Sequence, residues 1–431
     1  MSAIVSVVKD ADLRKKLLFT LAMIVLYRVG TQIPSPGVDY SSIMQAVKAA
    51  TQDDTNVYSL INLFSGGALL QLSVFAIGIM PYITASIIVQ LLTVVIPHFE
   101  ELKKEGQSGQ SKMMQYTRYL TVALALLQSS GIVALADRGQ LLGNGTSVLK
   151  ADRTPFDLVL MVLVMTAGAV LVMWIGELIT ERGIGNGMSL LIFTSIAARL
   201  PEQLLSIGQA GKWGSVAAIV ALLLLVAIAV VYVEQAQRRV PVQYAKRMIG
   251  RRQYGGTTTY IPLKINMSGV IPVIFASSIL ALPPMAAQFG KPDDAWVQWI
   301  SAHFTQGSSF YLTIYALMTL FFTFFYTAIT FNPDEVADNM KKYGGFIPGY
   351  RAGRPTAEYL RYVINRITSA GALYLVIIAL LPSLAIIPLK LSSSQMPFGG
   401  TTLLIIIGVG LQTVKEINTQ LQQHHYEGFL K

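Results

Sequence analysis

The chain has 431 residues, of which 53% are hydrophobic and only 13% are charged. Soluble domains usually carry about 25% charged residues, so this composition argues against a soluble protein and indicates that lipid is the solvent. Cysteine is absent, which excludes disulfides and thiolate metal sites, and a net charge of +10 is typical of a membrane protein with basic cytoplasmic loops.

Apolar runs of about 17–25 residues predict membrane-spanning helices. In chain order the runs are residues 17–33, 71–96, 114–135, 156–176, 188–200, 215–233, 268–284, 310–331, 367–389 and 401–414. The fifth and the last are short, so we expect flanking residues to complete those helices. No small-residue cleavage site follows the first run, which we therefore expect to remain in the mature protein.

The distribution of charge among the loops predicts the orientation. The loops after the second, sixth and eighth runs are strongly basic, whereas the alternate loops carry few cations. The positive-inside rule places the basic loops, both termini and the two large loops, residues 235–266 and 332–365, in the cytoplasm. About ten spans divide into halves of five, residues 1–205 and 206–431, and a repeated half with an odd number of spans is inverted.

An unusual segment precedes the second run. Residues 56–70 are apolar but too short to span a membrane, and Gly66-Gly67 separates them from the next helix. Two interpretations are open. The segment can dip back into the protein, because non-helical backbone is tolerated at depth when protein surrounds it. It can also be an ordinary interfacial helix.

No catalytic or metal-binding constellation stands out in the sequence. The four histidines have no metal-ligand spacing, and there is no phosphate loop or nucleophile elbow. The carboxylates Glu177, Glu234 and Glu416 fall near cytoplasmic helix ends, whereas an ion-coupled carrier needs such groups at mid-membrane. We therefore expect no enzyme activity, cofactor or metal. The sequence favours a passive channel in which the energy for transport is supplied from outside this chain.

Mid-helix positions are instead apolar and branched. Ile79, Ile83 and Ile87 recur every four residues, so they share one face of a helix, and Pro81 lies between them. From the pattern alone, such residues are expected to face lipid or to pack against neighbouring helices.

Several stretches resemble the SecY translocon family, in the family's order and over nearly the whole chain. Those that resemble its plug and second helix are Asn62-Leu63-Phe64-Ser65-Gly66-Gly67-Ala68 and Gly78-Ile79-Met80-Pro81-Tyr82-Ile83-Thr84. The stretch that resembles the start of its fifth helix is Ile179-Thr180-Glu181-Arg182-Gly183-Ile184-Gly185-Asn186-Gly187. Those that resemble its cytoplasmic loops are Tyr244-Ala245-Lys246-Arg247, Pro262-Leu263-Lys264-Ile265-Asn266, Phe331-Asn332-Pro333 and Phe346-Ile347-Pro348-Gly349.

The resemblance implies an all-α integral membrane protein, with about ten transmembrane helices in two pseudo-symmetric inverted five-helix halves that form a clamshell. Its implied function is a protein-conducting channel that translocates unfolded secretory proteins across the bacterial cytoplasmic membrane and inserts membrane proteins laterally into it. Implied partners are the small membrane subunits SecE and SecG, the SecA ATPase, the ribosome, signal peptides, unfolded preproteins and the lipid bilayer. The alternative is a secondary transporter of a small solute.

The resemblance also implies roles for individual residues. A ring of apolar side chains narrows the pore: Ile79, Ile83, Met188, Ile192, Ile274 and Ile405. Met188 departs from the branched residue usual in the family. The plug covers residues 59–70 and includes Ser59, Leu60, Ile61, Asn62, Leu63, Phe64, Ser65, Gly66 and Gly67. Polar residues at a lateral gate are Thr84, Gln128 and Asn266.

The two large loops carry the implied docking residues. Residues 240–244 alternate like a strand, and Gly255-Gly256 offers a turn before a second strand at 260–265. This predicts an exposed hairpin with Arg251 and Arg252 at its tip, suited to an acidic motor surface or to ribosomal RNA phosphates. Arg351 occupies the matching family position on the second loop.

Overall fold

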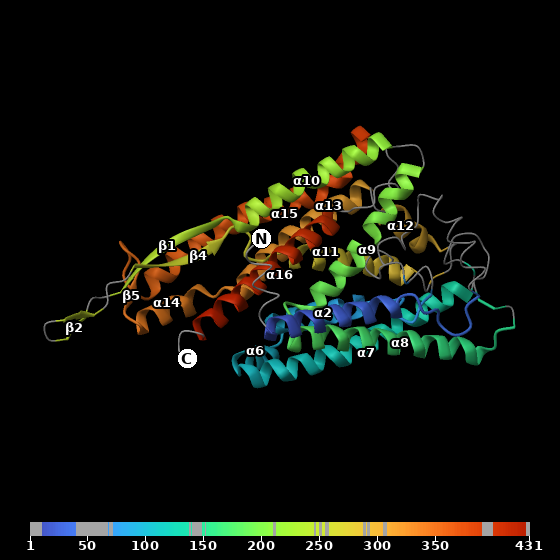
Figure 1. Cartoon of the computed structure of the whole chain (residues 1–431), viewed down its shortest axis with the longest axis horizontal. Helices are drawn as coiled ribbons and strands as arrows, with labels where there is room; N and C mark the ends of the chain where they lie inside the picture. The colour runs from blue at the N-terminus through green and yellow to red at the C-terminus, as the bar shows by residue number, and fades with distance from the viewer. Residues whose placement is uncertain are drawn as a thin grey trace.

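The computed structural model describes residues 11–39, 68, 72–137, 139, 149–150, 152–209, 213–244, 247–249, 252–254, 258–287, 290, 294–304, 308–389 and 400–427. The long helices in this part of the chain are α2 (Ala11–Gly30), α5 (Met80–Val95), α7 (Gln107–Asp137), α8 (Pro155–Arg182), α9 (Gly187–Gln209), α10 (Trp213–Gln235), α11 (Ile271–Ala287), α13 (Ser309–Thr330), α15 (Arg354–Leu389) and α16 (Gly400–Glu427) (Figure 1). The shorter helices are α6 (Pro97–Lys104), α12 (Ala295–His303) and α14 (Pro333–Lys342).

Every predicted apolar run overlaps one of these long helices, so the expectation of a helical membrane protein is confirmed. Within the described ranges, five helices are long and apolar enough to cross a membrane alone, and up to six if α5 and α6, bent by 98° at their junction, form one span. The others fall short for local reasons. The apolar parts of α9 and α11 are only Gly187–Ala198 and Ile271–Pro284, and α2 begins with the charges of Arg14-Lys15-Lys16.

The second helix begins later than predicted. We expected it over residues 71–96, but residues 72–79 form turns and a short bridge, and α5 starts at Met80. Gly78 has φ +60°, in the left-handed region that suits glycine, and Pro81 lies in the first turn of the helix, where its missing N–H costs nothing. The turns are buried and hydrogen-bonded, with the Ser35 amide donating to the Leu72 carbonyl at 2.9 Å.

The predicted hairpin is present in the first large loop. Strand β1 (Gln237–Tyr244) pairs antiparallel with β4 (Thr258–Lys264), and Val240 lies opposite Ile261. Beyond them β2 (Arg247–Ile249) pairs with β3 (Arg252–Tyr254). The other edge of β1 pairs with β5 (Gly345–Phe346) of the second large loop, giving the order β4-β1-β5.

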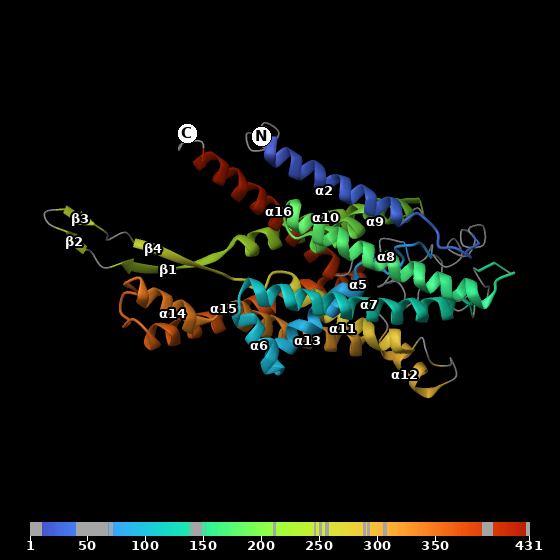
Figure 2. The same cartoon turned by 90° about the horizontal axis from the view of Figure 1, so that it is seen from below.

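The two large loops therefore pack into one unit, which we call the docking unit (residues 237–264 and 333–364, within the described ranges). Its small core combines the inward-facing side chains of the sheet with those of α14, α15 and the turn between them. The buried members are Val240, Val242, Leu263, Met340, Ile347, Leu360, Val363 and Ile364. Figure 2 shows the hairpin projecting from the bundle, on the side where α2 begins and α16 ends.

Candidate functional site

The six predicted ring residues belong to, or pack against, one hydrophobic cluster in the interior of the bundle. Ile79 and Ile83 lie one turn apart at the start of α5, and the others come from α9, α11 and α16. All five isoleucines belong to the largest hydrophobic cluster and are no more than 7% exposed. Met188 packs against this cluster. Four helices that are distant in sequence thus bring these apolar side chains together.

A cavity of about 890 Å³ adjoins this cluster. Ile83, Met188, Ile192 and Ile274 line one part of it. The rest of the lining comes from α5, α7, α8, α11 and the turn before α9. It mixes apolar side chains such as Met114 and Leu178 with polar and aromatic ones, including Tyr82, Ser86, Gln90, Arg118, Trp174, Glu177, Glu181 and Asn186. The polar groups of such a mixed lining can hold water, whereas its apolar part resists ions by dewetting.

An ion pair in the cavity wall joins α7 to α8. The Arg118 guanidinium donates from Nε to Glu177 Oε1 at 2.9 Å and from Nη2 to Oε2 at 2.8 Å. The side chains are 37% and 15% exposed, respectively. The pair was not predicted, because residues 59 positions apart on different helices have no spacing signal. Its bidentate geometry fixes the half of the α7–α8 hairpin that lies nearer α6.

The three predicted gate residues are all buried, but their bonds differ. Thr84 donates to the Met80 carbonyl of its own helix at 3.1 Å. Asn266 donates from Nδ2 to Glu234 Oε1 at 2.5 Å and to the Gly269 carbonyl at 3.0 Å. This network ties the turn before α11 to the end of α10, while α5 packs directly against α11 and α7. Asn266 therefore holds the base of α11.

The predicted docking residues lie in different parts of the docking unit. Arg252 begins β3 and pairs with Ile249, the last residue of β2, whereas Arg251 lies outside the described residues. Arg351 is exposed in a turn flanked by Gly349 and Gly353, both with positive φ. The plug residues Ser59–Gly67 also lie outside the described residues.

The Arg351 turn is held by its backbone and by its neighbours. Its carbonyl accepts a hydrogen bond from Thr356 Oγ1 at 2.7 Å, and the ring of Tyr350 stacks on that of Tyr359 with centroids 4.2 Å apart. The guanidinium itself faces solvent, so the turn presents a charge without needing it for its own fold.

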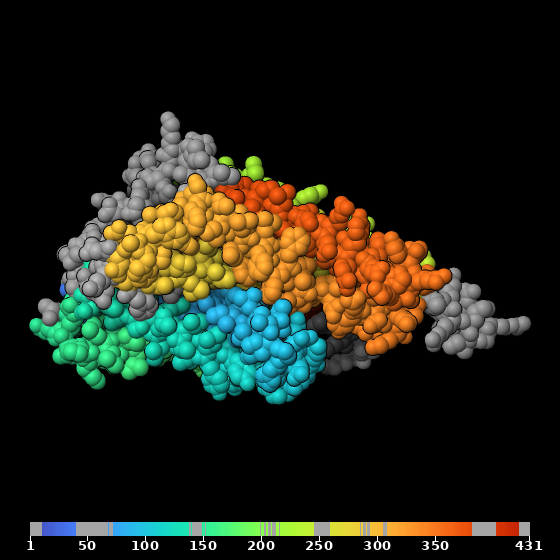
Figure 3. Space-filling view, turned by 180° about the vertical axis from the view of Figure 1, so that it is seen from behind, coloured from blue at the N-terminus to red at the C-terminus, as the bar shows by residue number. Residues whose placement is uncertain are grey.

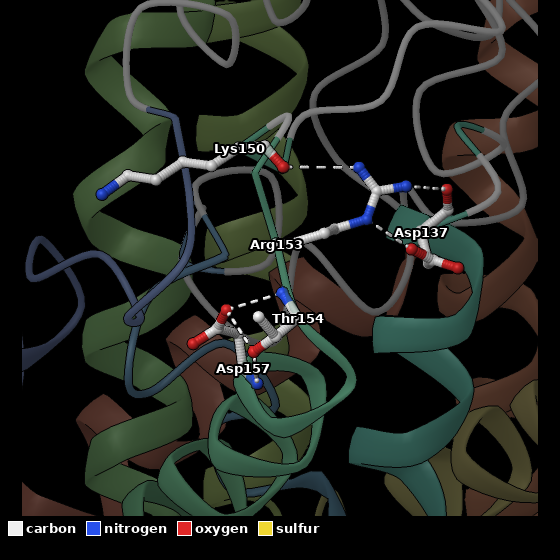
Figure 4. Close-up of polar contacts among 5 residues, drawn as sticks. All are labelled: Asp137, Lys150, Arg153, Thr154 and Asp157. Carbon is white, nitrogen blue, oxygen red and sulfur yellow. Dashed lines mark hydrogen bonds and ion pairs between the residues drawn. The ribbon is translucent and has the colours of Figure 1, made fainter.

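A second polar cluster closes the far end of the α7–α8 hairpin (Figure 4). Arg153 donates from Nε to Asp137 Oδ1 at 2.7 Å and from Nη1 to the Lys150 carbonyl at 3.4 Å. Thr154 and Asp157 form a capping box at the start of α8, with the Thr154 amide donating to Asp157 Oδ2 at 2.8 Å. The Thr-x-x-Asp spacing is a readable signal for this cap, although we had not singled it out.

Comparison with known proteins places these features in a family. Residues 73–414 match the SecY family model. A protein translocase subunit SecY of Corynebacterium glutamicum is 63% identical over 443 residues, and that of Mycobacterium tuberculosis is 58% identical over 440, each match covering all of both chains. A solved structure of a protein-conducting channel has a TM-score of 0.63 at 17% identity, covering 94% of this chain and 91% of that one. Sec61 in a canine ribosome-channel complex has a TM-score of 0.62 at 16% identity, with the same coverage, and shares the fold.

Proposed function

The chain belongs to the SecY family: it is a multi-pass bacterial membrane protein that acts as a protein-conducting channel and not as an enzyme. On that premise we propose a role in translocation for each group of its residues. Unfolded secretory chains enter the cavity and cross the apolar ring. The observation that carries this proposal has two parts: the six apolar side chains, from four helices, belong to or pack against one hydrophobic cluster, and four of them line a cavity of about 890 Å³. A small-solute carrier is the less favoured alternative.

The ring closes the pore to water and ions when it is empty, and it opens when a polypeptide chain passes. Branched aliphatic side chains and the flexible Met188 thioether make only dispersion contacts, which a passing chain can replace with contacts of its own. When no chain is present, the same side chains exclude water and ions. Residues 59–70 form the plug of this proposal and block the outer funnel beyond the ring, as the resemblance of their sequence to the family's plug suggests.

The two halves, residues 1–205 and 206–431, are proposed to part along a lateral seam. Support comes from the arrangement in Figure 3, where the blue-to-green segment and the yellow-to-orange segment face each other along a line. Helices α5 and α7 lie on one side, and α11 and α13 on the other. Buried Thr84 and Gln128 belong to the first side. Thr84 bonds within its own helix, so we expect the contacts across the seam to be mainly dispersion contacts, each worth only about 0.1–0.2 kcal/mol. An apolar signal helix can displace contacts of that strength.

The docking unit is proposed to receive the SecA motor and the ribosome. Its surface combines cations, such as Arg351, with exposed aromatic rings, including those of Tyr343, Phe346 and Tyr350. Exposed tyrosine and arginine side chains are the types most often found at interaction hot spots. SecE and SecG are proposed to pack against lipid-facing helices of the bundle.

The proposed location is the cytoplasmic membrane, with both termini in the cytoplasm. The basic docking unit lies on the side where α2 begins and α16 ends, as the positive-inside rule requires (Figure 2).

The ring is tested by making it polar. Ile83→Asn and Ile274→Asn should hydrate the constriction and raise resting ion conductance in planar bilayers, because the closed state loses its apolar barrier. The matched control is Ile377→Asn, since Ile377 is 53% exposed on α15 and lies away from the cavity. Conductance equal to that of the parent in both ring variants would reject the assignment of the ring.

A further inference from the structure

Helix α6 reaches sideways from the end of α5. The chain bends by 98° at Ile96-Pro97, so α6 leaves the direction of the span it follows. The helix is mostly polar, but Leu102 is only 2% exposed and the Phe99 ring packs on that of Tyr116 in α7. A Cβ added to Gly109 at the start of α7 would lie 1.7 Å from the Leu102 carbonyl oxygen, so α6 and α7 pack closely at this point. The side chain of the next residue, Lys103, therefore projects from a fixed site.

At the end of α13 one carbonyl lacks its usual donor. The Ile329 carbonyl would accept the amide of the residue four positions on, but that residue is Pro333, which has no N–H. The carbonyl also lies in the last turn of α13, where the helix dipole is negative and a cation is favourable. Lys103 Nζ donates to this carbonyl at 3.3 Å across 226 positions of sequence.

We infer that Lys103 is a positioning residue that fastens α6 to the end of α13 and so holds the lateral seam closed on its cytoplasmic side; this rests on the seam being the gate proposed above. Figure 3 shows the blue region that contains α6 bordering the light-orange region that contains α13. The adjacent Lys104 does not take part, because it pairs with Glu100 of its own helix at 2.7 Å. Opening the seam separates α6 from α13 and breaks the Lys103 bond.

The absence of cysteine allows a direct distance measurement. Glu101→Cys and Thr330→Cys place spin labels at exposed positions on α6 and at the end of α13, in the full-length channel reconstituted in nanodiscs. Lys103→Met should raise the ratio of long to short distances about two- to fivefold, the effect of losing a cation at a helix C-terminus. Lys103→Arg, which keeps a donor, should restore most of the short-distance population.

The matched control is Lys104→Met, which removes an equal charge from the next position of the same helix. A distance distribution in Lys103→Met that equals the parent's would overturn the inference, as would an equal widening in Lys104→Met. High salt should widen the parent's distribution and leave that of Lys103→Met unchanged, because the contact is exposed and screened. The distances report the α6–α13 contact whether or not the seam is a gate. A separate test of the gate is crosslinking of a signal sequence bound between α5 and α11. If no such crosslink formed, the gate would be rejected, whereas the spin-label distances would still test whether Lys103 fastens α6 to α13.

Discussion

Arg118 and Glu177 should be energetically coupled, and the size of the coupling can be bounded from their surroundings. Removing one partner of a buried pair costs about 3–5 kcal/mol, whereas an exposed pair contributes about 0.2–1 kcal/mol. The two side chains are 37% and 15% exposed, so they lie between these limits. We expect Arg118→Gln to lower the free energy of unfolding by about 1–3 kcal/mol.

The two single substitutions should not be equal. Arg118→Gln leaves the more buried Glu177 carboxylate without its donor, whereas Glu177→Gln leaves the guanidinium, which is better exposed and can be hydrated. Arg118→Gln should therefore cost more. The double variant leaves no unpaired charge. Its loss of unfolding free energy should therefore be smaller than the sum of the losses in the two single variants by about 1–2 kcal/mol.

The assay is equilibrium unfolding in mixed micelles titrated with a denaturing detergent, applied to the parent, both single variants and the double variant. Arg354→Gln is the control, because Arg354 and Glu358 form an i,i+4 pair in which the side chains are 90% and 61% exposed, and its loss should stay below about 0.5 kcal/mol. Additive losses in the cycle, or an Arg118→Gln loss as small as the control's, would refute the assigned coupling.

Three further predictions concern the plug, the docking unit and the α7–α8 hairpin. Deleting residues 59–70 should leave a folded channel with a raised ion leak in planar bilayers, unless a neighbouring segment is shown to refill the funnel. Arg351→Glu should leave insertion intact but weaken motor binding by about 2–5 kcal/mol if the charge pair is buried on docking; normal ATP-driven protection of a secretory substrate in reconstituted vesicles would contradict this. Thr154→Ala should remove the cap of α8 and lower the unfolding free energy by about 1 kcal/mol, measured as above, whereas Thr313→Ala is the comparison, because the exposed Thr313 hydroxyl bonds to the Ser309 carbonyl of its own helix.

The helices could be predicted from sequence because their signal is local. An apolar run has the same composition whatever it packs against, and each of the ten runs falls on a helix in the described part of the chain. The late start of α5 has a local signal too, since Gly78 and Pro81 both disfavour a continuous helix through residues 72–79. The continuous hydrophobicity of the run masks this signal, because turns and helix in residues 71–96 are equally apolar.

The contacts between distant elements could not be predicted in the same way. The Lys103 bond to the Ile329 carbonyl depends on the 98° bend before α6, and no pattern within either segment fixes that direction. The strand at residues 240–244 was predicted from its alternation, but its pairing with β5 was not, because two residues carry too little periodicity. As a result, the docking unit was predicted as two separate loops.

Asn266 illustrates the difference between a position and its contacts. Resemblance assigns it to the lateral gate, and that assignment stays a prediction. The hydrogen bonds to Glu234 and to the Gly269 carbonyl give it a further, local role at the base of α11. Both roles are compatible, because a gate helix has to be held at one end if it is to swing at the other.

The distribution of strong and weak contacts bears on the proposed lateral gate. Helices α7 and α8 are joined by the Arg118–Glu177 pair near one end, by Arg153 and Asp137 at the other, and by a buried hydrogen bond of 3.0 Å between the Ser129 and Thr166 hydroxyls. The seam between α6 and α13 is joined by an exposed lysine contact at 3.3 Å. If the proposed seam is the gate, we expect the α7–α8 hairpin to move as one body and the displacement to fall on the seam, because its exposed lysine contact is the weaker connection.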